Sequence, residues 1–130
     1  MFISRLSTQA FPGSTGDAGN LTINTNTLRV EGGAELDSGT FGEGKGGNLT
    51  VNASYVQLID IGDSPFVNGL VTVANPGSTG NAGDLTINSN VLRLEGDAKV
   101  IAGTVGKGKG GNLRIKTNTL RVEAGAQVRD

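Results

Sequence analysis

Two glycine-rich loops that carry lysine have the spacing closest to a known chemical motif in this sequence. They are GEGKGGNL from Gly42 to Leu49 and GKGKGGNL from Gly106 to Leu113, and both satisfy G-x-G-x-x-G. A phosphate-binding loop needs Ser or Thr after its lysine and a helix whose first amides face the anion. Here Lys45 and Lys109 are each followed by Gly and then by a strand-like segment. We therefore expect these loops to turn corners and to bind no nucleotide.

The acidic residues do not form a convincing metal site. In a calcium-binding β-roll the repeat GGxGxD supplies carboxylates from successive turns. The corresponding loops here contain lysine, which repels a cation, and the aspartates fall at scattered places: Asp17, Asp60, Asp63 and Asp97. The chain also has no histidine and no cysteine, so the commonest metal ligands are absent. We assign no metal-ligating or cofactor-binding residue and expect no cofactor.

Acid–base catalysis on a sheet face needs carboxylates that converge from neighbouring coils. Glu31 and Glu95 each follow an arginine by two positions, but 64 residues separate them and Ile59 occupies the intermediate position. We interpret the arginines as solvated exterior charges that discourage sideways association: Arg29, Arg93 and Arg121. We assign no catalytic residue and expect no enzymatic activity. A fragment of a solenoid polysaccharide-degrading enzyme remains the second alternative.

The composition limits both the core and the partners. Among 130 residues there are 22 Gly, four Phe, one Tyr and no Trp, so aliphatic side chains must fill the core. A net charge of −1, from 11 basic and 12 acidic residues, argues against a nucleic-acid partner. No apolar stretch is long enough for membrane insertion, and the apolar start before Ser4 is too short for a signal peptide.

An internal repeat determines the expected fold. The triplet Gly-Asn/Asp-Leu begins at Gly19, Gly47, Gly83 and Gly111, so the spacings are 28, 36 and 28 residues. Two lengths of coil, meaning one turn of a solenoid, therefore alternate within a repeat of 64 residues. We divide the single segment 1–130 into the third strand of a preceding coil (1–18), three coils (19–46, 47–82 and 83–110) and a partial coil (111–130). We expect the partial coil to end before its third strand.

Aliphatic residues keep register from coil to coil in four columns. These columns are Leu21, Leu49, Leu85, Leu113; Ile23, Val51, Ile87, Ile115; Leu28, Val56, Leu92, Leu120; and Val30, Leu58, Leu94, Val122. One polar residue separates the first column from the second and the third from the fourth, which is the alternation of half-buried strands. A weaker third strand is expected at 34–41, 69–75 and 98–105.

The sequence thus predicts an all-β fold, a right-handed parallel β-helix (β-solenoid) of about four coils, alternately 28 and 36 residues long. The extra residues of the longer coil are expected to lie in two corner segments, 59–69 and 75–83. No polar cap is visible at either end, so we expect open core ends and end-to-end self-association.

Polar residues also recur in columns. We expect the side chains of Asn20, Asn48, Asp84 and Asn112, and those of Asn24, Asn52 and Asn88 before Lys116, to form hydrogen bonds along the solenoid axis. A third column, of Thr22, Thr50 and Thr86, should line one outward face until Arg114 interrupts it. That face makes an ice- or carbohydrate-binding surface the first alternative function.

Three segments resemble the repeats of filamentous haemagglutinin-type exoproteins, particularly the cyanobacterial group: GNLTINTNTLRVEGGAEL, GKGGNLTVNASYVQLI and GKGGNLRIKTNTLRVEAGAQV. The resemblance covers essentially the whole chain but lies in scaffold positions, so it transfers no site residues. It implies a long β-helix exported by two-partner secretion, and hence a non-catalytic structural segment of a secreted adhesin. It also implies an extracellular or outer-membrane-surface location and a host-surface, matrix or carbohydrate ligand bound through the parent protein.

Overall fold

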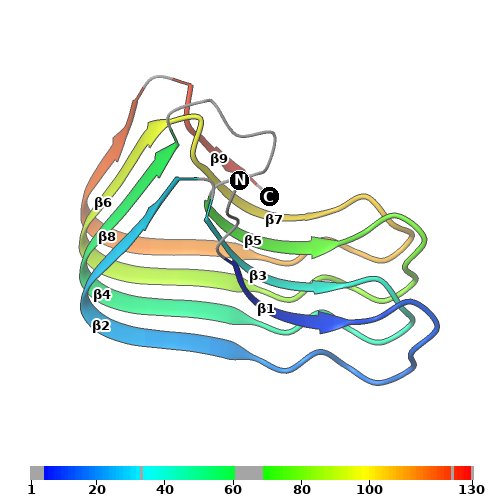
Figure 1. Cartoon of the computed structure of the whole chain (residues 1–130). Coiled ribbons are helices and arrows are strands. Elements are labelled where there is room, and N and C mark those ends of the chain that lie inside the picture. Colours follow the sequence, from blue (N-terminus) through cyan, green and yellow to red (C-terminus); the bar gives the residue numbers. More distant parts are fainter. Residues whose placement is uncertain (1–4, 33, 61–68, 124, 130) are drawn as a thin grey trace.

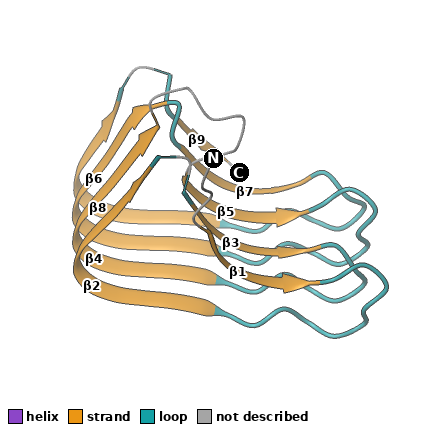
Figure 2. Ribbon diagram, in the orientation of Figure 1, coloured by secondary structure: helices purple, strands orange, loops and turns teal. Residues whose placement is uncertain are grey.

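The computed structural model describes residues 5–32, 34–60, 69–123 and 125–129, and its regular structure is entirely β-strand. The strands pair in parallel into two sheets (Figures 1 and 2). The first sheet contains, in spatial order, β1 (Arg5–Ala10), β3 (Glu35–Thr40), β5 (Gly69–Ala74), β7 (Lys99–Thr104) and β9 (Gln127–Arg129). The second contains β2 (Leu21–Glu31), β4 (Leu49–Asp60), β6 (Leu85–Gly96) and β8 (Leu113–Val122).

Successive strands alternate between the two sheets, so each coil adds one strand to each sheet. This arrangement confirms the predicted β-solenoid of about four coils. Figure 1 shows the coils stacked along one axis, with the bent strands on one side and the glycine-rich loops on the other. In the described part of the chain no helix is long and apolar enough to cross a membrane.

The number of strands in each coil differs from the prediction. β2 runs from Leu21 to Glu31 and bends in its middle, and its ladder to β4 is present at both Thr25 and Thr27. Each coil therefore contributes two strands, one of them bent, and the prediction of three short strands is wrong. Neither glycine nor proline occurs at the bend in any of the four coils, so nothing in the sequence ends the strand there.

The aliphatic columns stack as predicted. The strands of the second sheet pair so that one column contains Leu21, Leu49, Leu85 and Leu113. The other three predicted columns lie in the same ladders. In the two middle coils these side chains are completely buried: Leu49, Val51, Val56, Leu58, Leu85, Ile87, Leu92 and Leu94. The first sheet adds a further column, which contains Leu6, Leu36, Leu70, Val100 and Val128. A single narrow core therefore runs along the axis.

Burial falls toward both ends of this core. Leu120 is 50% exposed and Val122 is 44% exposed, whereas Leu92 and Leu94, one coil earlier in the same columns, are fully buried. Leu6 in β1 is 48% exposed. The outermost coils therefore present apolar side chains that the middle coils cover for one another.

The register of the strands shows where the longer coil carries its extra residues. Four positions separate the paired residues Glu31 and Glu35 in one coil, but ten separate their partners Ile59 and Gly69 in the next. At the second corner, nine positions separate Thr40 from Leu49. Their partners in the next coil, Ala74 and Leu85, are eleven positions apart. The surplus of eight residues is thus divided six and two between the two predicted corners. Residues 61–68 of the first corner lie outside the described residues.

The last coil contains a second strand, where the sequence was expected to end before one. β9 (Gln127–Arg129) pairs in parallel with β7, and Val128 lies over Val100 in the core column. The prediction that the chain ends before this strand is therefore wrong. A single apolar residue between two polar ones, Gln127-Val128-Arg129, is enough to continue the ladder when an edge of the sheet is already in place.

Candidate functional site

The glycine-rich loops stack on one another so closely that side chains would not fit. A Cβ atom on Gly44 would overlap the carbonyl oxygen of Gly16, and a Cβ atom on Gly80 would overlap that of Gly44. Equivalent glycines form two columns along the loops: Gly16, Gly44, Gly80 and Gly108, and Gly19, Gly47, Gly83 and Gly111. The spacing of these glycines is therefore explained by close approach of neighbouring backbones, as expected for corners.

The interior of each lysine loop is occupied by a threonine of the preceding strand. The Thr40 hydroxyl donates a hydrogen bond to the carbonyl oxygen of Gly44 at 2.7 Å and accepts one from the N–H of Gly42 at 3.2 Å. Thr104 donates in the same way to the carbonyl oxygen of Gly108 at 2.8 Å. These contacts close the loop upon itself. Sequence reasoning missed both threonines, although each stands two positions before its G-x-G-x-x-G motif.

A ladder of side-chain acceptors runs along the corner that precedes the second sheet. The Oδ1 atom of Asn20 accepts a hydrogen bond from the N–H of Asn48 at 2.9 Å, and Oδ1 of Asn48 accepts from the N–H of Asp84 at 2.8 Å. Oδ1 of Asp84 continues the series to the N–H of Asn112 at 2.8 Å. The predicted axial hydrogen bonding is therefore confirmed. Asp fits where Asn otherwise stands because the ladder uses only the acceptor oxygen.

Hydrogen bonds of the same kind join alternate pairs of loops, three residues before the positions of this ladder. Oδ1 of Asp17 accepts a hydrogen bond from the N–H of Lys45 at 2.8 Å, and Oδ1 of Asn81 accepts from the N–H of Lys109 at 2.8 Å. The carboxylate of Asp17 thus has a structural role, because it joins two neighbouring loops. The side chains of Lys45 and Lys109 point their charge into solvent, since both residues are exposed.

The second predicted ladder lies on the outward face of the bent strands. Nδ2 of Asn52 donates to Oδ1 of Asn24 at 2.8 Å, and Nδ2 of Asn88 donates to Oδ1 of Asn52 at 2.8 Å. Beside it, Thr22, Thr50 and Thr86 are in register, and Arg114 follows them as predicted. The unequal coil lengths leave this face undisturbed, because the extra residues lie at other corners.

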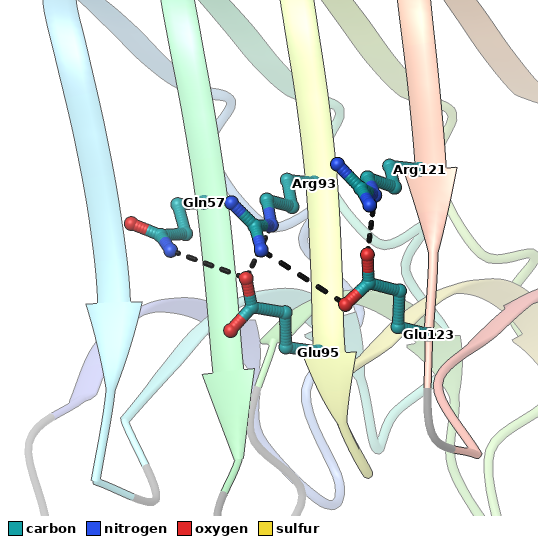
Figure 3. Close-up of polar contacts among 5 residues, drawn as sticks. All are labelled: Gln57, Arg93, Glu95, Arg121 and Glu123. Atoms are coloured by element: carbon teal, nitrogen blue, oxygen red, sulfur yellow. Dashed lines mark hydrogen bonds and ion pairs between the residues drawn. The ribbon is translucent and has the colours of Figure 1, made fainter.

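A cluster of charged residues occupies the outward face near the ends of β6 and β8 (Figure 3). Arg93 forms an ion pair with Glu95, and its Nη2 lies 3.9 Å from Oε2 of Glu123. Arg121 forms an ion pair with Glu123, and Gln57 donates to Glu95 at 3.5 Å. Each glutamate therefore lies between cationic or amide groups from neighbouring strands. This arrangement stabilises charge pairs and leaves neither carboxylate as an isolated acid or base.

Sequence reasoning placed the arginines of this cluster correctly on the exterior but overlooked Glu123. The N–H of Glu123 donates to the carbonyl oxygen of Leu94 at 2.9 Å, which brings Glu123 beside Glu95 on the neighbouring coil. The signal was present, because Arg121-Val122-Glu123 repeats the spacing of Arg29 and Glu31, which lie three coils earlier. Arg29 and Glu31 form a more exposed pair at 3.2 Å.

Tyr55 on β4 completes the cluster. A hydrogen bond with Tyr55, and the charges of Glu95 and Glu123, raise the pKa of the Arg93 guanidinium above its already high ordinary value. A raised pKa of a cation contributes stability that is fully present at neutral pH and is lost only as the pH rises through that pKa. Arg93 therefore stays protonated over the physiological pH range, and its contribution to stability does not change with pH there.

The remaining acidic residues include two that are buried. Asp37 is 3% exposed and accepts hydrogen bonds from the side chains of Ser7, at 3.1 Å, and Gln9. Asp60 is 5% exposed at the end of β4. Asp63 lies outside the described residues. Within the described ranges no three His, Cys, Asp or Glu side chains gather closely enough to hold a metal ion.

Two surface hollows accompany these features. One has a volume of about 730 Å³ and lies at the bend of β4, β6 and β8, where asparagine, serine and threonine line it. The other has a volume of about 750 Å³ and lies on the first sheet, where Val71, Val73 and Ile101 line it together with Glu35 and Arg129.

Comparisons with known proteins provide no identification. Neither the family models, nor the curated proteins, nor the solved structures contain a match to this chain. The role of the chain is therefore inferred from its repeat motifs and from the geometry described above.

Proposed function

We propose that this chain is a non-catalytic structural segment of a secreted adhesin of the filamentous haemagglutinin type, exported by two-partner secretion to the extracellular space or the outer-membrane surface. Its role in that protein is to extend a shaft and present surface. The host-surface, matrix or carbohydrate ligand is then bound through the parent protein. The resemblance of the repeat motifs quoted above supports the family, and the solenoid fold supports the mechanical role.

One observation carries the mechanical part of the proposal. Polar groups of each coil are satisfied by the next coil through the ladder of Asn20, Asn48, Asp84 and Asn112. The glycine columns bring the same backbones into contact. Each coil therefore offers the next one equivalent hydrogen-bonding groups. The free energy of folding accumulates along the axis, as it does in other repeat proteins. Such a structure is suited to length and stiffness.

The proposal predicts that the shaft can be lengthened by whole repeats. A second copy of residues 19–82, inserted after Ala82, joins the chain at a position where one Gly-Asn/Asp-Leu triplet replaces another. We expect the longer protein to keep its β-sheet circular dichroism and to grow by about 10 Å, two strand spacings, in small-angle X-ray scattering. An insert of the same residues in scrambled order is the control and should not extend the particle. A folded protein of unchanged length would contradict the shaft.

Location is tested separately. In the cells that make the protein, proteinase K added to intact cells should remove an epitope inserted between Ile59 and Gly69, where the two coil lengths already differ. Protection of that epitope until the cells are lysed would contradict surface exposure without affecting the shaft experiment.

A further inference from the structure

We propose that the shallow, open hollow at the bend of β4, β6 and β8 is a binding groove for a linear, uncharged polysaccharide that lies along the solenoid axis. Its lining includes Asn52, Ser54, Asn88, Asn90, Lys116 and Asn118, contributed by three successive coils. This binding is independent of the shaft role, because the groove is present on these coils whether or not they act as a spacer.

The hydrogen-bonding capacity of the groove matches hydroxyl groups. Each asparagine amide offers two N–H donors and an oxygen with two lone pairs. Among the described residues the ladder uses only part of this capacity, since Asn88 donates to Asn52 while its own Oδ1 accepts nothing, and Ser54 forms no hydrogen bond. Asn118 donates to Asn90 at 3.3 Å and likewise retains its oxygen. Sugar hydroxyls both donate and accept, so they complement such a mixed lining.

The charge and polarity of the lining exclude other classes of ligand. Lys116 is the single charged residue among those that line the hollow, which is too little positive charge for a polyanion. The side chains are mainly amides and hydroxyls, so an apolar helix or peptide would leave polar groups unsatisfied. A neutral, hydroxyl-rich chain satisfies both conditions.

The direction of the groove follows from the register. Ser54, Asn90 and Asn118 are equivalent positions on neighbouring strands, because the nearest paired residues before and after them keep one register. Neighbouring strands are about 4.8 Å apart, which is close to the length of one sugar in an extended chain. A polysaccharide along the axis can therefore place one sugar against each coil.

The test is isothermal titration calorimetry of the 130-residue protein with cellohexaose as the neutral probe and hexagalacturonate as the charged one. We expect cellohexaose to bind and Asn90→Ala to weaken that binding about two- to tenfold, the effect of one hydrogen bond. The matched control is Asn112→Ala, since Asn112 is likewise exposed but lies at the corner before β8, outside the hollow. Its affinity should be unchanged.

Three outcomes would overturn the proposal. They are no heat of binding with cellohexaose, binding of hexagalacturonate alone that disappears at high salt, and equal weakening by Asn112→Ala and Asn90→Ala. Circular dichroism of each variant establishes that it is folded. Should Asn90→Ala not fold, Ser54→Ala tests the same groove from an exposed position with no hydrogen bond to lose among the described residues.

Discussion

The side chain of Asn48 accepts a hydrogen bond from the backbone N–H of Asp84 at 2.8 Å, while the backbone N–H of Asn48 donates to the side chain of Asn20. One residue thus joins the coil before it to the coil after it. Because these bonds cross between coils that are 28 and 36 residues apart in sequence, the corner aligns coils of unequal length.

Loss of the Asn48 side chain should weaken this alignment. Asn48→Ala removes the acceptor of the Asp84 N–H, so we expect the free energy of unfolding to fall by about 0.5–1.5 kcal/mol. Asn112→Ala is the matched control, because the Asn112 side chain accepts no such bond among the described residues and only its backbone takes part in the ladder. Urea denaturation measures both variants. If both variants lost the same free energy of unfolding, the hydrogen-bond ladder would not explain the effect of Asn48→Ala.

Glycine at position 80 should be far less replaceable than its equivalent one repeat earlier. A Cβ atom on Gly80 would overlap the carbonyl oxygen of Gly44, whereas one on Gly16 meets nothing within 4 Å. We expect Gly80→Ala to cost about 1–3 kcal/mol, as overpacking does. Gly16→Ala should be neutral or stabilising by up to about 1 kcal/mol, because alanine restricts the unfolded chain. Thermal unfolding of the two variants provides the comparison, and similar melting temperatures would refute close stacking.

The exterior charge cluster should contribute more than an isolated pair. Arg93 contacts Tyr55, Glu95 and Glu123 and its side chain is 35% exposed, whereas Arg29 contacts Glu31 and is 58% exposed. We therefore expect Arg93→Met to lower the urea midpoint more than Arg29→Met. The difference should shrink as sodium chloride is added, since salt screens surface charges. A difference that persists at high salt would indicate packing by the arginine stem as its cause.

Self-association of the 130-residue chain should depend on the exposed end of the core. Leu120→Lys places a charge where a half-exposed leucine ends a buried column. We expect sedimentation velocity to show concentration-dependent association of the unmodified protein and a monomer for this variant. Val105→Lys is the control, because Val105 is 69% exposed but lies in a loop outside the columns. A monomeric parent, or the same effect from Val105→Lys, would contradict end-to-end stacking.

Much of the fold could be predicted because the repeat places equivalent residues directly above one another. Leu21, Leu49, Leu85 and Leu113 fall in one column from their spacing alone, and the triplet that precedes them marks the corner. The bend within β2 was not predictable in this way. Period-2 alternation changes phase between Ile23 and Leu28, and that change has the same appearance whether a strand bends or ends.

The side-chain contacts were predicted where similar residues recur in every coil. The hydrogen bonds of Thr40 and Thr104, which recur only in alternate coils, were missed. The two asparagine ladders follow from recurrence of one residue type. The cluster of Arg93, Glu95 and Glu123 depends instead on Tyr55 and Gln57, which have no equivalents at their positions in the other coils. The burial of Asp37 depends on two polar residues of β1 that no repeat pattern singles out.

The six additional residues between Ile59 and Gly69 leave the pairing on both sides in register. The perimeter of a coil can therefore change while the pitch of the stack stays constant. This corner offers a natural place for grafting foreign peptides, such as epitopes or recognition sequences, at a defined height on the rod. In a lineage of such proteins, the same freedom would let new surface segments be gained or lost one coil at a time.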